Sequence, residues 1–408
     1  MPEISLADRP ARLTACLTLV AFLPMLSSDL FLPALPAIAS ALAVPVAATQ
    51  RLFDSYFAGL ALSLLVCGPL SDRHGRRRPL LAALALHAAT SLAMAGAHDL
   101  ATLSACRFAQ GLASGIPVAL WRSIAFDALP LEAATRAISV VVPVMVVSPA
   151  LAPIVGEWIA ALAGWRAIFA ALAGVGALAF ALTWGFVPET HRPAPAGGAA
   201  RQWMSSWLAL ARSRRFVSFC ALACAAYAAY FLYLFQAPLL LALGYTPRAI
   251  SYAYLPVTAG FVLGSAVGRR FAPRAGDRAI VTAGTALFAA GAVLLAGWGV
   301  AGRPLGAAGL LLAAALLVAA ALLVAANGTL LTIGVARTLA RFPLLRGTSS
   351  ALLGFSQAAV TALMVGRMSR LNEVLPQARS LSIMIGACLL LAMAALWVYR
   401  RAISDTSS

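Results

Sequence analysis

"VCGPLSDRHGRRRPLLAALAL" occupies residues 66–86 of a chain of 408 residues. An apolar run ends at Gly68-Pro69, one aspartate and four arginines follow within residues 72–78, and a second apolar run then begins. Charged side chains are costly in the hydrocarbon core of a bilayer, so this pattern is typical of a short loop between two membrane-spanning helices. The stretch therefore predicts an all-α membrane protein.

The composition extends this prediction to the whole chain. Hydrophobic residues make up 62% and charged residues 11%, and the mean hydropathy is +0.91, whereas soluble proteins carry about 25% charged residues. The net charge of +17 comes from 30 arginines without a lysine. Most of these arginines lie in short loops, so we interpret the charge as membrane topology and expect no nucleic-acid partner.

Apolar stretches separated by charged or turn residues predict twelve transmembrane helices. They cover residues 12–37, 50–71, 79–97, 100–121, 137–160, 164–187, 216–242, 249–268, 279–299, 305–335, 347–368 and 380–399. If both termini lie on one side, most arginines fall in the loops of that side, which the positive-inside rule assigns to the cytoplasm. We therefore expect a multi-pass protein of the bacterial inner (cytoplasmic) membrane with both termini cytoplasmic.

The longest polar segment divides these helices into two sets of six. Residues 188–215 are rich in Pro, Gly, Ala and Arg, and within them "QWMSSWLALARS" predicts a short amphipathic surface helix. We expect an amino-terminal six-helix bundle at 1–187, a cytoplasmic linker at 188–215, and a carboxy-terminal six-helix bundle at 216–408. The loops after the second and eighth helices share a Gly-then-Arg pattern, as expected for repeated bundles that rock about a central site.

Several kinds of chemistry are not expected. The six cysteines lie in apolar stretches without CxxC spacing or a histidine partner, so we expect neither a metal site nor a disulfide framework. The chain lacks the GxxxxGK[ST] phosphate-binding motif and a nucleophile–base pair. We therefore expect no enzyme activity, no cofactor and no ATP-driven transport by this chain.

The opening motif resembles a known family. "GPLSDRHGRRRPLL" at 68–81 resembles the loop between helices 2 and 3 of the major facilitator superfamily. "RFAQGLASG" at 107–115 is similar to the helix 4 motif of that family, and "VSPALAPIVGEW" at 147–158 is similar to the helix 5 motif of its proton-coupled antiporters. The resemblance implies the major facilitator fold with two six-helix bundles and alternating access.

Further stretches resemble the Bcr/CflA branch of drug:proton antiporters. They are "SDLFLPALP" at 28–36, "GWRAIF" at 164–169, "VPET" at 187–190 and "RGTSSALLGFSQ" at 346–357. Two departures are Glu157, where the branch usually has a glycine, and Ser148-Pro149 in place of Gly-Pro. The resemblance implies exchange of small-molecule substrates for protons and antibiotic resistance. We expect the protein to be a monomer.

The charged loop has two interpretations. It is either a positive-inside stop with a tight turn at Gly75, or a cytoplasmic gate. In the gate, Asp72 docks at the start of helix 11 near Gly347, where free backbone N–H groups favour an anion, and Arg73 or Arg77 pairs with Asp127. The residues of this predicted gate are Gly68, Asp72, Arg73, Gly75, Arg76, Arg77 and Asp127.

Two ionisable residues lie deep in predicted helices. At about 1.5 Å per residue, Asp29 in helix 1 and Arg107 in helix 4 both lie roughly 10–12 Å below the outer surface. Charges at this depth are costly, so we expect the two to face an aqueous cavity and to interact. They form either a static ion pair or a proton switch, in which Asp29 takes up a proton when the pair loosens and a cationic substrate competes for the same carboxylate.

Helix 5 carries Pro149, Pro153 and Gly156 on one face. This antiporter motif indicates either an ordinary kinked span or an interface with the carboxy-terminal bundle that prevents ion leak. His87 is alone on an apolar face and is interpreted as structural. Asp54 is interpreted as solvated near the outer start of helix 2, with a role at the cavity mouth as the alternative.

Candidate substrate contacts come from the second half of the chain. Aromatic residues of helix 7 offer stacking and cation–π surfaces for lipophilic cations, although such clusters also serve packing. The candidates are Tyr227, Tyr230, Phe231, Phe235, Gln236, Asn327 and Gln357. The function expected is proton-coupled multidrug efflux. The alternatives are an exporter or symporter of one metabolite and, from another class, a non-transporting sensor or channel.

Overall fold

The computed structural model describes residues 9–190, 199–241, 277–301, 346–375 and 377–404, together with isolated residues between 255 and 270. Nearly all of these residues are helical, which confirms the predicted fold class. Of the predicted spans, 305–335 lies outside the described residues and 249–268 almost entirely so. The described chain forms two compact units, Met1–Val44 with Ser55–Trp203 and Pro45–Asp54 with Met204–Ser408.

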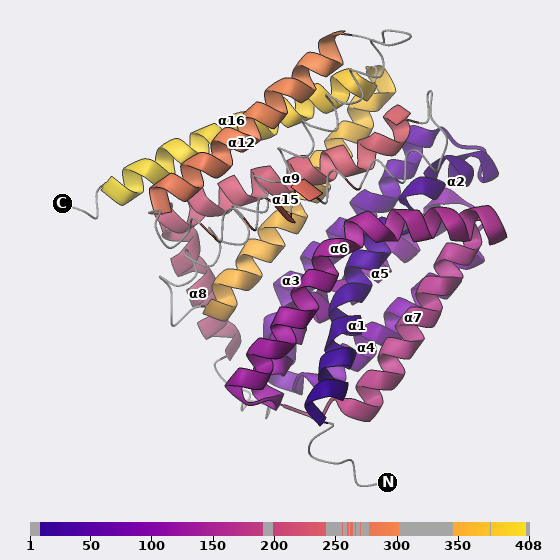
Figure 1. Ribbon diagram of the computed structural model, residues 1–408, viewed down its shortest axis with the longest axis vertical. Coiled ribbons are helices and arrows are strands. Elements are labelled where there is room, and N and C mark those ends of the chain that lie inside the picture. The colour runs from indigo at the N-terminus through magenta and orange to yellow at the C-terminus, as the bar shows by residue number, and fades with distance from the viewer. Residues whose placement is uncertain are drawn as a thin grey trace. The chain divides into compact units, whose positions relative to one another are not determined.

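The first unit is a bundle of long helices that pack side by side (Figure 1). Its elements are α1 (Arg9–Asp29), η1 (Leu32–Ala34), α2 (Leu35–Ala41), α3 (Arg51–His74), α4 (Arg77–Ala95), α5 (Leu100–Ala128), α6 (Leu131–Ala163) and α7 (Trp165–Phe186). Helix α1 packs against α5, α6 and α7, and α4 packs against α5 and α7. The first turn of α3 is grouped with the second unit.

The second unit is also almost entirely helical where it is described. Its elements are η2 (Val46–Gln50), α8 (Ala199–Arg212), α9 (Arg214–Leu241), α12 (Asp277–Ala301), α15 (Arg346–Val374) and α16 (Gln377–Ser404). Helix α16 packs against α9 and α12, and α15 packs against α9. The short helix predicted within the linker is confirmed as α8.

Local chemistry sets the helix boundaries in the first unit. Gly164, with φ +78°, separates α6 from α7 in a conformation that suits glycine. Asp99 begins α5 as its N-cap, because its carboxylate accepts hydrogen bonds from the backbone N–H and the hydroxyl of Thr102, both at 2.7 Å. These bonds lower the pKa of the Asp99 carboxyl below its usual 3.8.

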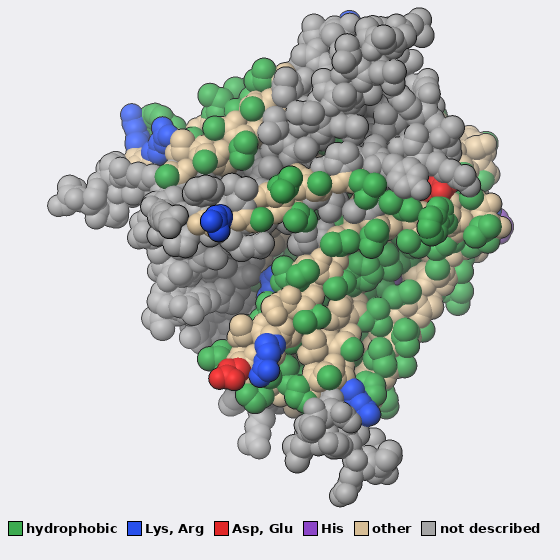
Figure 2. Space-filling view, in the orientation of Figure 1, with side chains coloured by type: hydrophobic (Ala, Val, Ile, Leu, Met, Phe, Trp, Pro, Cys, Tyr) green, Lys and Arg blue, Asp and Glu red, His purple; other side chains and the backbone are tan. Residues whose placement is uncertain are grey.

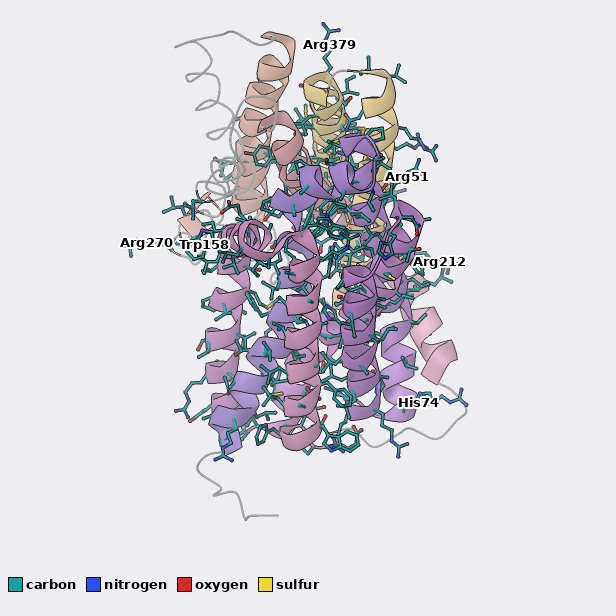
Figure 3. All side chains as sticks on the ribbon, turned by 90° about the vertical axis from the view of Figure 1, so that its right-hand side faces the viewer. Arg51, His74, Trp158, Arg212, Arg270 and Arg379 are labelled. Carbon is teal, nitrogen blue, oxygen red and sulfur yellow. The ribbon has the colours of Figure 1, made fainter. Side chains whose placement is uncertain are left out.

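The described helices suit a membrane. Eight helical stretches in the described chain are long and apolar enough to cross a bilayer. Large apolar side chains such as Leu92 and Leu162 are exposed. Hydrophobic side chains cover much of the described part of the face shown in Figure 2. Figure 3 shows His74 and Trp158 toward opposite ends of the first unit.

Candidate functional site

Helix α1 ends at Asp29, inside the first predicted span of 12–37, which is therefore not one continuous helix. Pro33 lacks the N–H that would bond to the carbonyl of Asp29, which disfavours a further helical turn, and a turn and η1 follow. The last carbonyl groups of α1 consequently lack helical partners. The break exposes backbone oxygens to side chains from neighbouring helices.

Asp29 is buried at this break. Its side chain is 2% exposed, and its Oδ1 lies 2.7 Å from Ser28 Oγ, whose single hydroxyl proton is shared with the Met25 carbonyl at 2.8 Å. The buried side chain of Ser148 on α6 lies beside the same carboxyl group, but its hydroxyl makes no hydrogen bond of ordinary geometry. The carboxyl group is thus enclosed by α1 and α6.

Arg107 of α5 is fully buried and binds the free end of α1. Its Nη1 donates to the backbone oxygen of Ser27 at 3.0 Å and to Gln110 Oε1 at 2.6 Å. Its guanidinium carbon lies 4.2 Å from the ring centroid of Phe31 and 4.5 Å from that of Tyr56. A cation is favoured by the carbonyl end of a helix and by aromatic faces, so this pocket accommodates a buried positive charge.

Both charges predicted to interact therefore lie in one buried site of the first unit. The Arg107 guanidinium acts electrostatically on the Asp29 carboxyl, while each group keeps its own hydrogen-bond partners. This arrangement differs from a simple ion pair, because the arginine is held in place by a carbonyl, an amide and two rings. When Asp29 changes its charge, Arg107 keeps its polar contacts with Ser27 and Gln110.

Glycines bring the helices of this site close together. A Cβ atom at Gly111 of α5 would overlap the backbone oxygen of Tyr56, and one at Gly59 of α3 would overlap that of Phe108. Small residues permit such close backbone contact between membrane helices. The close crossing of α3 and α5 places the Tyr56 ring against Arg107, and Tyr56 also donates to the Pro24 carbonyl at 3.0 Å.

The antiporter motif of α6 contacts the same region. A Cβ atom at Gly156 would overlap the backbone oxygen of Leu30, next to Asp29. Pro149 and Pro153 lie within the continuous helix α6, and Pro153 is buried. The described contacts thus place the Gly156 face against α1 within the first unit, and an interface of this motif with the carboxy-terminal bundle stays a prediction.

The predicted gate loop is contacted by a glutamate that sequence reasoning missed, Glu189 in the segment after α7. Gly75 has φ +78°, and the exposed Glu189 carboxylate lies against it. Glu189 accepts hydrogen bonds from the backbone N–H groups of Arg76 at 2.8 Å and Arg77 at 3.2 Å. It therefore caps the amino end of α4. In the sequence it stood out only as part of the quoted stretch "VPET", which did not predict this role.

The partner of Asp127 is Arg76, at 2.6 Å, and the structure thus corrects the expectation of Arg73 or Arg77. Arg77 instead donates to the Trp184 carbonyl at 2.6 Å, because the turn at Gly75 directs consecutive arginines to different helices. Arg73 is exposed. Gly68 is half-buried within α3, while the side chains of Asp72 and of the residues around Gly347 lie outside the described part.

The predicted substrate residues are described only in part. On α9, the Phe231 ring lies 4.7 Å from that of Tyr227 and 4.9 Å from that of Tyr230, between ring centroids. Gln357 on α15 is half-buried, and its Nε2 has no hydrogen bond. The side chains of Phe235 and Gln236, and all of Asn327, lie outside the described residues. The aromatic cluster exists, and its role in binding stays a prediction.

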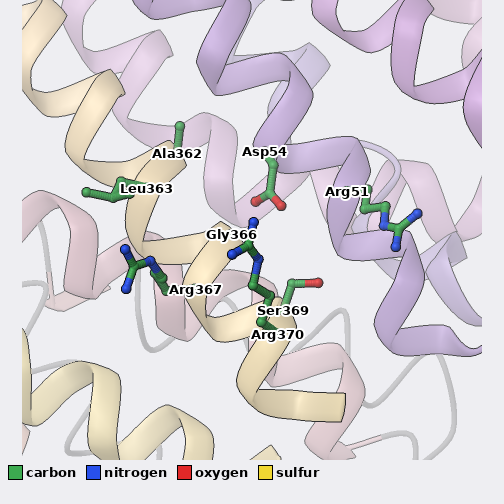
Figure 4. Close-up of a pocket in the computed structure, with 8 residues that line it drawn as sticks. All are labelled: Arg51, Asp54, Ala362, Leu363, Gly366, Arg367, Ser369 and Arg370. Atoms are coloured by element: carbon green, nitrogen blue, oxygen red, sulfur yellow. The ribbon is translucent and has the colours of Figure 1, made fainter.

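Asp54 lines a pocket of the second unit instead of being fully solvated. The pocket has a volume of about 590 Å³, with Arg51 and Asp54 from the first turn of α3 on one side and Arg367 and Arg370 from α15 on the other (Figure 4). Asp54 is half-buried, and its Oδ1 has no hydrogen bond. The remaining lining residues are Ala362, Leu363, Gly366 and Ser369.

No cluster of three or more His, Cys, Asp or Glu side chains suited to a metal ion occurs among the described residues. The site at the end of α1 instead combines the single carboxyl of Asp29 with the donors and acceptors around Arg107. A buried carboxyl group of this kind is chemically able to take up and release a proton.

Two helical units, apolar enough for a bilayer and with ionisable groups buried between helices, define a polytopic membrane protein of the secondary-transporter class. The family model of the Major Facilitator Superfamily matches residues 17–341. The chain belongs to this superfamily, which confirms the resemblance drawn from the loop at 68–81.

Curated relatives agree with the resemblance to drug:proton antiporters. The chain is 31% identical over 176 residues to the bicyclomycin resistance protein homolog of Haemophilus influenzae, which covers 43% of this chain and 44% of the relative. It is 34% identical over 166 residues to the multidrug resistance protein MdtL of Shewanella oneidensis, covering 41% and 42%. The chain thus spans less than half the length of these relatives.

Solved structures share the fold. The D-xylose-proton symporter matches with a TM-score of 0.75 at 15% identity, over 96% of this chain and 97% of that one. A variant of the nucleoside transporter NupG matches with a TM-score of 0.70 at 14% identity, over 95% and 100%. At these identities the likeness establishes the major facilitator fold alone.

Proposed function

We propose that this chain is a proton-coupled exporter of small lipophilic or cationic compounds that works by alternating access. The observation that carries the proposal is the buried pair of Asp29 and Arg107, which lie in one site yet have separate hydrogen-bond partners. The names of the relatives, which include bicyclomycin and multidrug resistance proteins, support the substrate class.

The geometry suggests how exchange would work. A carboxylate at Asp29 is stabilised by the nearby guanidinium of Arg107 and by the Ser28 hydroxyl. A proton or a cationic substrate can neutralise this carboxylate, but not both at once. Binding of substrate from the cytoplasm would therefore release the proton, and a proton arriving from outside would release the substrate after the cavity has reopened to that side.

Arg107 would keep this exchange reversible. Its contacts with Ser27, Gln110 and two aromatic rings do not depend on the charge of Asp29. The guanidinium therefore stays in place while the carboxyl alternates between its charged and neutral forms. A buried ion pair with no other partners would instead resist separation, because breaking it leaves an unpaired charge that costs about 3–5 kcal/mol.

The setting of this activity is also proposed. We place the chain in the inner membrane, with both termini in the cytoplasm, because most arginines then lie in cytoplasmic loops. We propose that the protein functions as a monomer with a substrate cavity. Aromatic side chains such as Tyr227 and Phe231 would contact flat or cationic substrates there.

The test uses purified protein in liposomes with an acidic interior. Wild-type protein should drive accumulation of a fluorescent lipophilic cation and a matching rise of interior pH, and Asp29→Asn should abolish both. Arg136→Gln, a change at an exposed side chain of α6, serves as the control and should behave as wild type. Cation transport by Asp29→Asn with undiminished pH change would overturn the proposal. Growth inhibition of a pump-deficient host then defines the substrates.

A further inference from the structure

His87 of α4 lies against the end of α1, although its sequence position indicated only a structural role. The side chain is 1% exposed, and its Nε2 lies 2.7 Å from Ser27 Oγ. Ser27 is two residues before Asp29, and its carbonyl binds Arg107. The histidine is therefore linked through Ser27 to Arg107 and to the chain segment that carries Asp29.

The hydrogen bonds of Ser27 determine which nitrogen of His87 carries the proton. The single hydroxyl proton of Ser27 goes to the Leu23 carbonyl at 2.7 Å, so Ser27 Oγ must accept from Nε2–H of the imidazole. Nδ1 has no hydrogen bond and faces Gly176, where a Cβ atom would lie only 3.0 Å away. The side chain is thus a neutral Nε2–H donor.

Burial disfavours a charged imidazole at this position. Of the charged groups on the neighbouring helices α1, α5 and α7, Arg107 acts on the imidazole and would oppose a second positive charge. Asp29 is on α1, and Arg166 lies at the start of α7, where it binds the Ala97 carbonyl at 3.1 Å. No acceptor is placed to bind a proton on Nδ1.

The contact with Ser27 belongs to a closed circuit of hydrogen bonds. Arg107 Nη1 donates to the Ser27 carbonyl and to Gln110 Oε1, and Gln110 Nε2 donates to Ser91 Oγ at 2.7 Å. Ser91 Oγ donates in turn to the backbone oxygen of His87 at 2.7 Å. The circuit joins α1, α4 and α5, so a change at His87 is transmitted to the end of α1 and to the guanidinium.

We propose that His87 is a positioning residue of the proton-coupling site, a fixed neutral donor that holds Ser27 and thereby sets the position of Arg107 relative to Asp29. The proposal rests on the proposed function. A purely structural histidine would affect folding alone. A positioning histidine also affects the pH at which Asp29 exchanges its proton.

The experiment compares His87→Gln with His87→Asn. The glutamine amide reaches about as far as Nε2 and can donate to Ser27, whereas the shorter asparagine amide corresponds to Nδ1 and falls short. Ser27→Ala removes the acceptor and leaves His87 in place. Proton release on addition of a lipophilic cation is measured in detergent as a function of pH, for protein that elutes as a single species.

Wild type and His87→Gln should share one midpoint. His87→Asn and Ser27→Ala should shift it upward by about half a pH unit or more, because a displaced guanidinium stabilises the Asp29 carboxylate less. Unchanged midpoints in both variants would overturn the positioning role while leaving the proposed function intact. Absence of release from wild type would overturn the proposed function and, with it, this role.

A second readout is independent of transport. In protein labelled with ¹⁵N-histidine, the signal that disappears in His87→Gln should report an Nε2–H tautomer that does not titrate between about pH 5 and about pH 9. A His87 signal that titrates in this range, or that carries its proton on Nδ1, would overturn the assignment. If His87→Asn does not fold, Ser27→Ala together with this spectrum decides the question.

Discussion

Arg107 donates to the backbone oxygen of Ser27 at 3.0 Å, so a buried cation lies at the carbonyl end of the helix that also carries Asp29. The bond exists because α1 stops at Asp29 and leaves its last carbonyls free. The helix break therefore provides the polar contacts that a buried guanidinium needs. Because of these contacts, the position of Arg107 does not depend on whether Asp29 is charged.

Arg107→Lys should reduce exchange by about tenfold or more while keeping the charge. An ammonium group does not reproduce the planar contacts with Ser27, Gln110 and the two rings, and a lost hydrogen bond to a charged group costs about 1.5–3 kcal/mol. Transport in liposomes measures the effect. Arg136→Lys, at an exposed position, is the matched control, and equal loss in both variants would refute the specific role of Arg107.

Gly156→Ala should destabilise the protein and displace the end of α1. The added Cβ would overlap the Leu30 carbonyl, and overpacking of this kind costs about 1–3 kcal/mol. The apparent melting temperature in detergent should fall. Gly174→Ala is the control, because nothing lies within 4 Å of its Cβ position, and it should be neutral or slightly stabilising. A Gly156→Ala protein as stable as Gly174→Ala would contradict the close packing.

Glu189→Ala should lower the melting temperature by removing the cap of α4. The carboxylate binds the backbone N–H groups of Arg76 and Arg77, and loss of a helix cap costs about 0.5–2 kcal/mol. Glu132→Ala offers a comparison, since that glutamate is exposed and lies 4.0 Å from Arg136; its effect should be within about 0.5 kcal/mol of zero. Similar effects of the two changes would count against the cap.

The stabilisation of the amino end of α5 by Asp99 should depend on pH. Its pKa is lowered by the bonds to Thr102, so its contribution to stability is complete above the usual 3.8 and is lost as pH falls through the lower folded-state value. Asp99→Asn keeps a capping side chain and removes this dependence, whereas Asp99→Ala removes both. Melting temperatures between about pH 2 and about pH 6 test this. A wild-type acid dependence that survives in Asp99→Asn would exclude Asp99 as its source.

The sequence predicted the helices better than their interruptions. Long apolar stretches bounded by arginines define α4 and α7 within a few residues, and Gly164 marks the boundary between α6 and α7 as expected. The break of α1 was not predicted, because proline is tolerated within membrane helices when other groups replace the lost bonds. Here Arg107, 80 residues away in the sequence, takes the carbonyl of Ser27.

Side-chain partners were the least predictable part of the site. Arg76 and Arg77 are neighbours, yet one pairs with Asp127 and the other binds the Trp184 carbonyl, because the turn at Gly75 and the Glu189 cap orient them. His87 looked isolated because its partner lies 60 residues earlier in the chain. Helical periodicity gives the face on which a residue lies, but not the side chain that meets it from another helix.

The most direct measurement is infrared difference spectroscopy on addition of a lipophilic cation to the purified protein. We predict loss of a protonated-carboxyl band and gain of a carboxylate band, both absent in Asp29→Asn and retained in Asp54→Asn. The same difference bands in Asp29→Asn would contradict the claim that Asp29 is the group that exchanges its proton for substrate.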